Sequence, residues 1–225
     1  GVGGCCDTAR WLNVGSSSGT DAQVWINLLD GDLVFKRVGG PSFNVNIKDG
    51  KHYTMKAYAE HISSGTADEL SGLTLVGMQT LVGDADNGGF VNFDLELDGG
   101  AKSFVFSPSD AEGNYMAGSN VSVNNLSFVT EEGEAGGPGP VVADCEPGET
   151  AISFGLGETV VDGATVDAKG LSGQGGLDEL NGLYGAQACI EFGVSNADSF
   201  GVGGCCDTAR WLNVGSSSGT DAQVW

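Results

Sequence analysis

Short runs in which apolar and polar residues alternate make up most of this chain, and glycine, aspartate and asparagine separate them. Residues 52–58 (HYTMKAY) and 90–97 (FVNFDLEL) are two examples. A period of two residues is typical of a strand with one buried face and one exposed face. By the same criteria we predict further strands at residues 24–29, 33–38, 43–47, 104–106, 121–123, 124–128, 151–156, 159–161 and 189–194.

Three glycine-containing segments separate pairs of these strands. They are residues 30–32 (DGD), 48–51 (KDGK) and 98–100 (DGG). Glycine supplies the positive φ that a tight turn needs, so an Asp-Gly pair between alternating runs predicts a β-hairpin. We therefore expect the two strands on either side of each turn to be hydrogen-bonded neighbours.

Helical periodicity is weak along the whole chain, and only residues 177–183 suggest one or two helical turns. Many short strands at a spacing of roughly 8–12 residues are typical of a β-sandwich or a jelly roll. We therefore predict an all-β protein, an antiparallel β-sandwich of jelly-roll-like type.

An internal repeat is the most informative feature of the sequence. Residues 201–225 repeat residues 1–25 (GVGGCCDTARWLNVGSSSGTDAQVW) without a single difference, at an offset of 200. Such identity indicates either a tandem array with a 200-residue period or a constructed overlap of the two ends. Both explanations remain open at this stage, and the array is the one we favour.

The repeat changes the expected domain organisation. Residues 131–148 are rich in glutamate, glycine and proline, which predicts an exposed linker. The sequence ends at residue 225, inside a predicted strand, and shows no signal peptide, so we expect an excerpt of a repeat cut in the middle of a domain. Residues 1–130 would then hold the later strands of one β-sandwich unit, and residues 149–225 the first part of the next.

Composition and charge exclude several classes of protein. The 225 residues include 30 acidic and 9 basic ones, a formal net charge of -21. Such a surplus of negative charge repels phosphate backbones and argues against nucleic-acid binding. No apolar stretch reaches the roughly 18 residues of a membrane span, so no membrane insertion is expected. A hydrophobic content of 40% is too high for a disordered acidic tail.

Two segments carry a family resemblance. Residues 52–59 (HYTMKAYA) resemble the central strand of jelly-roll domains similar to carbohydrate-binding modules, and residues 118–128 (GSNVSVNNLSF) are similar to their last strand. Such domains occur on enzymes and in tandem on bacterial surface proteins. Long, nearly identical repeats also resemble the extender regions of giant adhesins and extracellular filaments. The resemblance brings no binding residue with it.

The cysteines point to an oxidising, extracellular compartment. Disulfides are common outside the cell, and the spacing here does not match a zinc site because no C-x-x-C motif is present. Cys205 and Cys206 repeat Cys5 and Cys6, so four of the six cysteines are unique, and four cysteines allow three pairings. We favour a pairing in which Cys145 and Cys189 each bond one member of the adjacent pair Cys205 and Cys206. The six candidate disulfide residues are Cys5, Cys6, Cys145, Cys189, Cys205 and Cys206.

Two loops rich in oxygen donors are candidate calcium sites. One contains Asp84, Asp86 and Asn87, and the other contains Asp110, Glu112 and Asn114. Alternating carboxylates and amides beside a glycine are typical of calcium loops, although Leu95, the twelfth position of a loop that begins at Asp84, lacks the carboxylate of an EF-hand. An ordinary turn is the competing interpretation. The high negative charge favours a divalent cation, so calcium is the one cofactor the sequence suggests.

Aromatic residues offer a candidate surface for sugars or for a neighbouring repeat. Trp11 and its copy Trp211 are candidate contact residues for a glycan or another unit, whereas Trp25 lies in an apolar strand and is expected in the core. Tyr53, Tyr58 and Tyr115 could extend an aromatic platform.

A hydrolase is a distant alternative. Residues 15–19 (GSSSG) match the G-x-S-x-G pattern, with Ser17 as nucleophile, Asp30 or Asp32 as the acid and His52 or His61 as the base. The alternating helices and parallel strands that this motif requires are absent from the pattern, so no enzyme activity is expected.

We therefore expect a structural protein: a repeat of a secreted or cell-surface filament or adhesin stalk that joins head to tail with other copies of itself. The alternative is a calcium-supported carbohydrate-binding module of a secreted protein, with surface glycans as partners.

Overall fold

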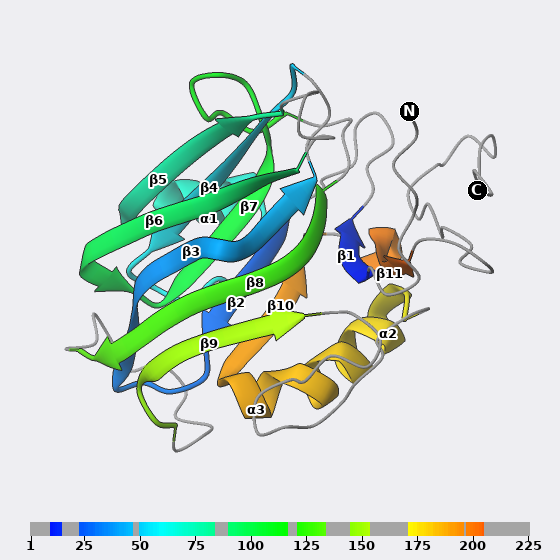
Figure 1. The fold of residues 1–225 in the computed structure, drawn as a ribbon. Helices are drawn as coiled ribbons and strands as arrows, with labels where there is room; N and C mark the ends of the chain where they lie inside the picture. The colour runs from blue at the N-terminus through cyan, green and yellow to red at the C-terminus, as the bar shows by residue number, and fades with distance from the viewer. Residues whose placement is uncertain are drawn as a thin grey trace.

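A computed structural model of the chain describes residues 10–14, 23–46, 50–83, 90–116, 121–133, 145–153, 171–195 and 197–204. These residues form two antiparallel sheets that pack face to face (Figure 1). The predicted all-β, antiparallel sandwich is therefore confirmed.

The first sheet has six strands, five of them in the order β11-β1-β8-β3-β6. The sixth, β9, pairs with β8 along residues 125–130, next to the stretch 121–123 that pairs with β1. The bounds are Arg10–Val14 for β1, Leu33–Asn46 for β3, Phe90–Ala101 for β6, Val121–Glu132 for β8, Gly148–Ser153 for β9 and Phe200–Gly204 for β11.

The second sheet has five strands in the order β10-β2-β7-β4-β5. The bounds are Val24–Leu28 for β2, His52–Tyr58 for β4, Leu75–Val82 for β5, Ser103–Ser109 for β7 and Ile190–Val194 for β10. Strand β4 has the bounds that alternation predicts, whereas β5 was not predicted because its residues (LVGMQTLV) do not alternate.

The core lies between the inner faces of the two sheets. Phe35 of the first sheet meets Phe104 of the second edge to face, with 5.0 Å between the ring centroids, and meets Phe128 in the same way at 5.1 Å. Such aromatic pairs add to the free energy of burial. Alternate residues of β2 and β4 (Val24, Ile26, Leu28, Tyr53, Met55 and Ala57) complete this side of the core.

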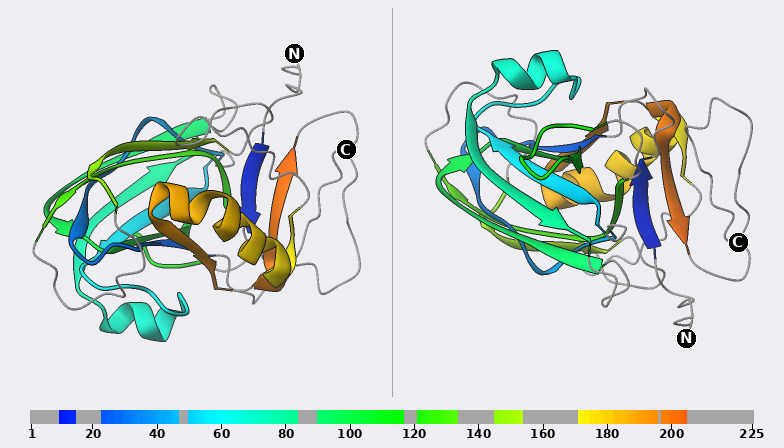
Figure 2. Two further views of the ribbon diagram at one scale, coloured as in Figure 1. Left: turned by 90° about the horizontal axis from the view of Figure 1, so that it is seen from below. Right: turned by 90° about the horizontal axis from the view of Figure 1, so that it is seen from above.

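Helical segments lie against the sandwich in two places (Figure 2). Helix α2 (Gly173–Leu180), a π-helical turn (Asn181–Gly185) and α3 (Ala186–Ala188) run next to β10, and Leu177, Leu180 and Tyr184 are buried in the common core. The predicted helix at 177–183 is therefore present and is longer than expected. Helix α1 (Ala67–Gly72), which was not predicted, lies on the outer face of the second sheet.

The three predicted hairpins are wrong, although the chain does turn in all three places. Strands β2 and β3, β3 and β4, and β6 and β7 each lie in different sheets, so each turn crosses from one sheet to the other. A glycine with positive φ, such as Gly50 at 66° or Gly100 at 75°, allows either kind of turn. Local turn chemistry therefore predicted where the chain reverses but not which strands would pair.

Strands from both sides of the predicted linker share one sandwich. Strand β9 pairs with β8, β10 pairs with β2, and β11 pairs with β1. Strand β8 extends to Glu132 and β9 begins at Gly148, so both intrude on the segment 131–148 that was predicted as linker. How consecutive copies would divide these strands in a longer chain stays a prediction.

Candidate functional site

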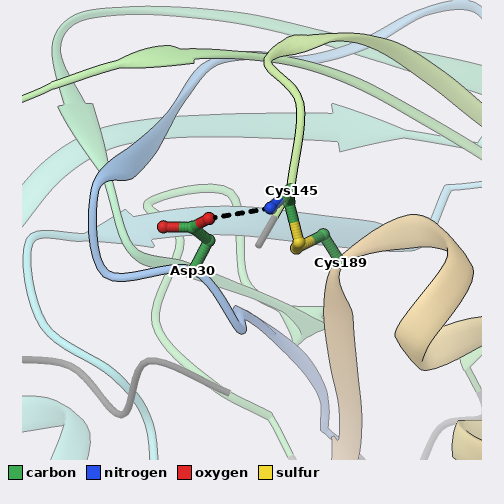
Figure 3. Close-up of side chains that lie close together, drawn as sticks. All are labelled: Asp30, Cys145 and Cys189. Atoms are coloured by element: carbon green, nitrogen blue, oxygen red, sulfur yellow. Dashed lines mark hydrogen bonds between the residues drawn. A yellow bond between two sulfur atoms is a disulfide. The ribbon is translucent and has the colours of Figure 1, made fainter. Parts of the chain in front are cut away.

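A disulfide joins Cys145, just before β9, to Cys189, just before β10 (Figure 3). Their Cα atoms are 6.2 Å apart, within the usual range for a disulfide. The pairing that we favoured from the sequence is therefore wrong for these two cysteines. Cys145 and Cys189 bond to each other because they precede β9 and β10, two strands of opposite sheets whose first residues lie close together here. Cys5, Cys6, Cys205 and Cys206 lie outside the described residues.

Asp30 lies beside this disulfide, in the turn between β2 and β3. Its side chain is only 7% exposed. One carboxylate oxygen accepts a hydrogen bond from the backbone N–H of Asp32 at 2.8 Å, and the other accepts one from the N–H of Cys145 at 3.1 Å. The backbone N–H of Leu29 also donates to the carbonyl of Cys189 at 2.9 Å. The turn is therefore tied to both ends of the disulfide.

A buried lysine completes the same region, and no sequence pattern pointed to it. Lys102 is 3% exposed, and its ammonium group donates hydrogen bonds to the carbonyls of Gly31, at 2.7 Å, and Leu33. Burial lowers the pKa of Lys102, and the negative charges of Asp30 and Asp32 oppose this shift. We call Asp30, Lys102, Cys145 and Cys189 the clamp, since together they fasten the turn 30–32 to both halves of the chain.

Three members of the clamp, Asp30, Cys145 and Cys189, form the one group of possible metal ligands found among the described residues. A carboxylate oxygen of Asp30 and the sulfurs of Cys145 and Cys189 lie within 4.8 Å of one another. Only a thiolate binds zinc well, and the two sulfurs here are bonded to each other. In this oxidised form the arrangement is a covalent cross-link with a capped carboxylate, which suits stability and not metal catalysis.

Three of the six predicted calcium residues lie in the described part of the chain. Asp84, Asp86 and Asn87 lie outside the described residues. The carboxylate of Asp110 accepts hydrogen bonds from the backbone N–H of Glu112 at 3.0 Å and of Asn114 at 2.8 Å. The Asn114 side-chain amide donates a further bond at 2.9 Å, and these bonds lower the pKa of Asp110. Hydrogen bonds within the loop thus already use both oxygens of Asp110.

Two of the three tyrosines proposed for an aromatic platform are buried, and the third, Tyr115, is half-buried. Trp25 is 7% exposed, as expected for a core residue, while Tyr53 and Tyr58 are 4% and 3% exposed. Burial raises the pKa of Tyr53 well above its usual range. Strand β1 contains Trp11, but the side chain of Trp11 and all of Trp211 lie outside the described residues.

Trp25 belongs to a small cluster on the outer face of the second sheet. This outer cluster consists of Trp25, Tyr58, Ile62 and Val105, with Leu70 and Leu73 packed against it. Asn27 fastens the covering loop, because its amide donates to the Ile62 carbonyl at 2.8 Å and its oxygen accepts from the Ile62 N–H at 2.9 Å. The outer cluster therefore holds α1 on the sheet and presents no flat aromatic row.

Strand β5 lies at an edge of the second sheet as far as the structure is described, and it exposes apolar side chains. Leu75, Val76, Met78 and Val82 are 39–50% exposed, and Met116 is 52% exposed. Scattered apolar exposure is common, but several such residues on an edge strand are a typical place for association.

Four of the five residues of the hydrolase alternative lie in the described part of the chain, in the turn between β2 and β3, at the start of β4 and in the loop over β2. Ser17 lies outside the described part, and Asp30 belongs to the clamp. His52 begins β4, while Nε2 of His61 lies 2.7 Å from the Leu28 carbonyl in the loop over β2. No known protein helps to decide, since no family model, no curated protein and no solved structure matches this chain. No helix among the described residues is long and apolar enough to cross a membrane.

Proposed function

We propose that this chain is a structural repeat of a secreted or cell-surface filament or adhesin stalk, and that it joins head to tail with other copies of itself. The observation that carries the proposal is the pairing of β1 with β11. Strand β1 belongs to the first copy of the 25-residue repeat, and residues 201–204 of β11 belong to the second. The repeated segments thus meet each other at one end of the first sheet (Figure 1).

The clamp supports an extracellular setting. A disulfide persists in oxidising compartments and is rare in the cytosol. The bond between Cys145 and Cys189 spans 44 residues and fastens β9 to the start of β10. Such a cross-link resists unfolding under shear or protease attack, which suits a protein whose work is mechanical.

The burial of Trp25, Tyr53 and Tyr58 favours this structural role over sugar binding. A glycan platform needs exposed aromatic faces, and these three side chains face the core or the outer cluster instead. Among the candidates for sugar contact, Trp11 and Trp211 keep their status as predictions.

The proposal is tested on chains of one, two and three 200-residue periods, imaged by negative-stain electron microscopy. We expect elongated particles whose length increases by a constant step with each period. Compact particles that do not lengthen would contradict the structural role. Binding on a glycan array that disappears in the double variant Trp11→Ala, Trp211→Ala would instead support the carbohydrate-binding alternative.

A further inference from the structure

The register between β1 and β11 has a counterpart inside each copy of the repeat. Arg10 pairs with Gly204, Leu12 with Val202, and Asn13 with Gly201. Residues 201–204 are identical to residues 1–4, and residues 210–214 are identical to residues 10–14. The same register within one copy would therefore pair residues 201–204 with residues 210–213, and Phe200 with Val214.

The connection inside one copy has the right length for such a hairpin. Only residues 205–209, five in number, separate Gly204 from Arg210. Connections of two to five residues are the usual ones in β-hairpins. One copy of the repeat can form this strand pair within itself, but the structure forms it between the two copies. Such a replacement of an internal strand pair by an identical external one is typical of domain swapping.

Both neighbours of β1 are firmly placed. On one side, β8 pairs with it through Leu12 and Val123. On the other side, the backbone N–H of Val202 donates to the Leu171 carbonyl at 2.8 Å, and both Phe200 and Val202 are buried in the core. The place between β8 and β11 thus exists whichever copy of the sequence RWLNV occupies it.

We propose that residues 210–214 exchange with β1 for this place between β8 and β11, so that the repeated segment is the joint between successive copies. The exchange replaces a strand by one of identical sequence, so the pairing with β8 and β11 can be kept. The free energy of the exchange is therefore small, and the effective concentrations of the two copies decide which of them occupies the place. Within this chain the exchange closes a hairpin; in an array it links the end of one unit to the first sheet of the next. This inference rests on the proposed structural role and identifies the segment that would connect successive copies.

Proline substitutions in the two copies test the exchange. Proline cannot donate to a strand ladder, so Leu12→Pro removes β1 from competition and Leu212→Pro removes its copy. Because either copy can fill the place, we expect each single variant to lower Tm by less than about 3 °C and the double variant by about 8 °C or more, given roughly 2–4 °C for each kcal/mol at this length. Leu212→Pro is the matched control for Leu12→Pro.

The result that overturns the exchange is a Leu12→Pro variant as destabilised as the double variant, or one that does not fold at all while Leu212→Pro melts like the parent chain. Hydrogen exchange gives a second readout. Peptides that include Phe200 belong to the second copy alone in both chains, and in these peptides we expect slower exchange at residues 211–214 in Leu12→Pro than in the parent chain. Unchanged exchange there would also contradict the proposal.

These measurements separate the joint from the proposed function. If the variants show no exchange but chains of several periods still lengthen step by step, the structural role stands and the joint lies elsewhere. If the variants show exchange but the longer chains stay compact, the exchange stands and the structural role fails.

Discussion

Trp25 can lie across β10 only because residue 193 is a glycine. The two residues are paired across β2 and β10, and a Cβ atom at position 193 would overlap the indole ring. On another side of the ring, a Cβ at Gly65 would come within 2.5 Å of Trp25 Cδ1. At the scale of residues, the outer cluster therefore depends on two positions without side chains.

We predict that Gly193→Ala lowers the free energy of unfolding by about 1–3 kcal/mol, as overpacking usually does. Urea denaturation followed by tryptophan fluorescence measures the effect. The control is Gly182→Ala, at an exposed helical position where a Cβ would meet nothing within 4 Å. This control should be neutral or stabilising by about 0.4–1 kcal/mol. Equal effects of the two variants would show that Trp25 does not pack as described.

At the scale of elements, the loop over the outer cluster is ordered by a single carboxylate. Glu69 of α1 accepts hydrogen bonds from the backbone N–H groups of Ser63 at 2.6 Å, Ser64 at 2.7 Å and Gly65 at 2.8 Å. Thr66 caps the helix, since its hydroxyl oxygen accepts from the Glu69 N–H. Burial raises the pKa of Glu69, but the N–H donors outweigh burial and hold it below its usual value.

This shift predicts a pH dependence of stability. Since the pKa of Glu69 is lower in the folded than in the unfolded protein, its stabilisation is present above about pH 4.5, the unfolded value, and is lost as pH falls through the folded value. The difference in unfolding free energy between the parent chain and Glu69→Gln should be about 1 kcal/mol or less at pH 7, because the site is partly exposed, and should shrink below pH 4.5.

Denaturant melts between pH 3 and pH 7 measure this difference. The control, Asp68→Asn, removes the same charge one residue away and leaves the three backbone hydrogen bonds of Glu69 in place. It should destabilise the protein less than Glu69→Gln does at pH 7. A difference for Glu69→Gln that grows towards low pH would have the wrong sign for the described contacts.

At the scale of the whole molecule, the clamp ties the last third of the chain to the first. We predict that the double variant Cys145→Ala, Cys189→Ala loses about 2–4 kcal/mol of unfolding free energy under oxidising conditions. Non-reducing peptide mapping with trypsin and Glu-C separates Cys189 from Cys205 and Cys206. Recovery of Cys145 bonded to Cys205 or Cys206 would contradict the described disulfide.

The net charge of -21 leads to a second prediction at this scale. If calcium binds the loop of Asp84, Asp86 and Asn87, adding calcium should raise Tm by at least about 3 °C, or about 1 kcal/mol at this length. Sodium chloride at equal ionic strength is the control for screening. The double variant Asp84→Asn, Asp86→Asn should remove the response, and an unchanged melt in EDTA would count against calcium.

Many of the strand positions, the turn positions and the β class were predictable from the sequence because they depend on neighbouring residues, whereas β1, β5 and β11 were not predicted. Alternation at residues 52–58 follows from one buried and one exposed face, and glycines at 50 and 100 mark reversals through their positive φ. The repeat of residues 1–25 is likewise visible in the sequence alone. The candidate site was predictable only in part: the cysteines were recognised, but not their pairing.

Only the tertiary structure decided which sheet each strand joins, that Cys145 bonds Cys189, and that Lys102 is buried against the carbonyls of the turn 30–32. It also decided that the first copy of the repeat pairs with the second. Each of these facts depends on contacts between residues far apart in the chain. The free energy of such contacts comes from the burial and hydrogen bonding of the whole sandwich, which no local pattern records.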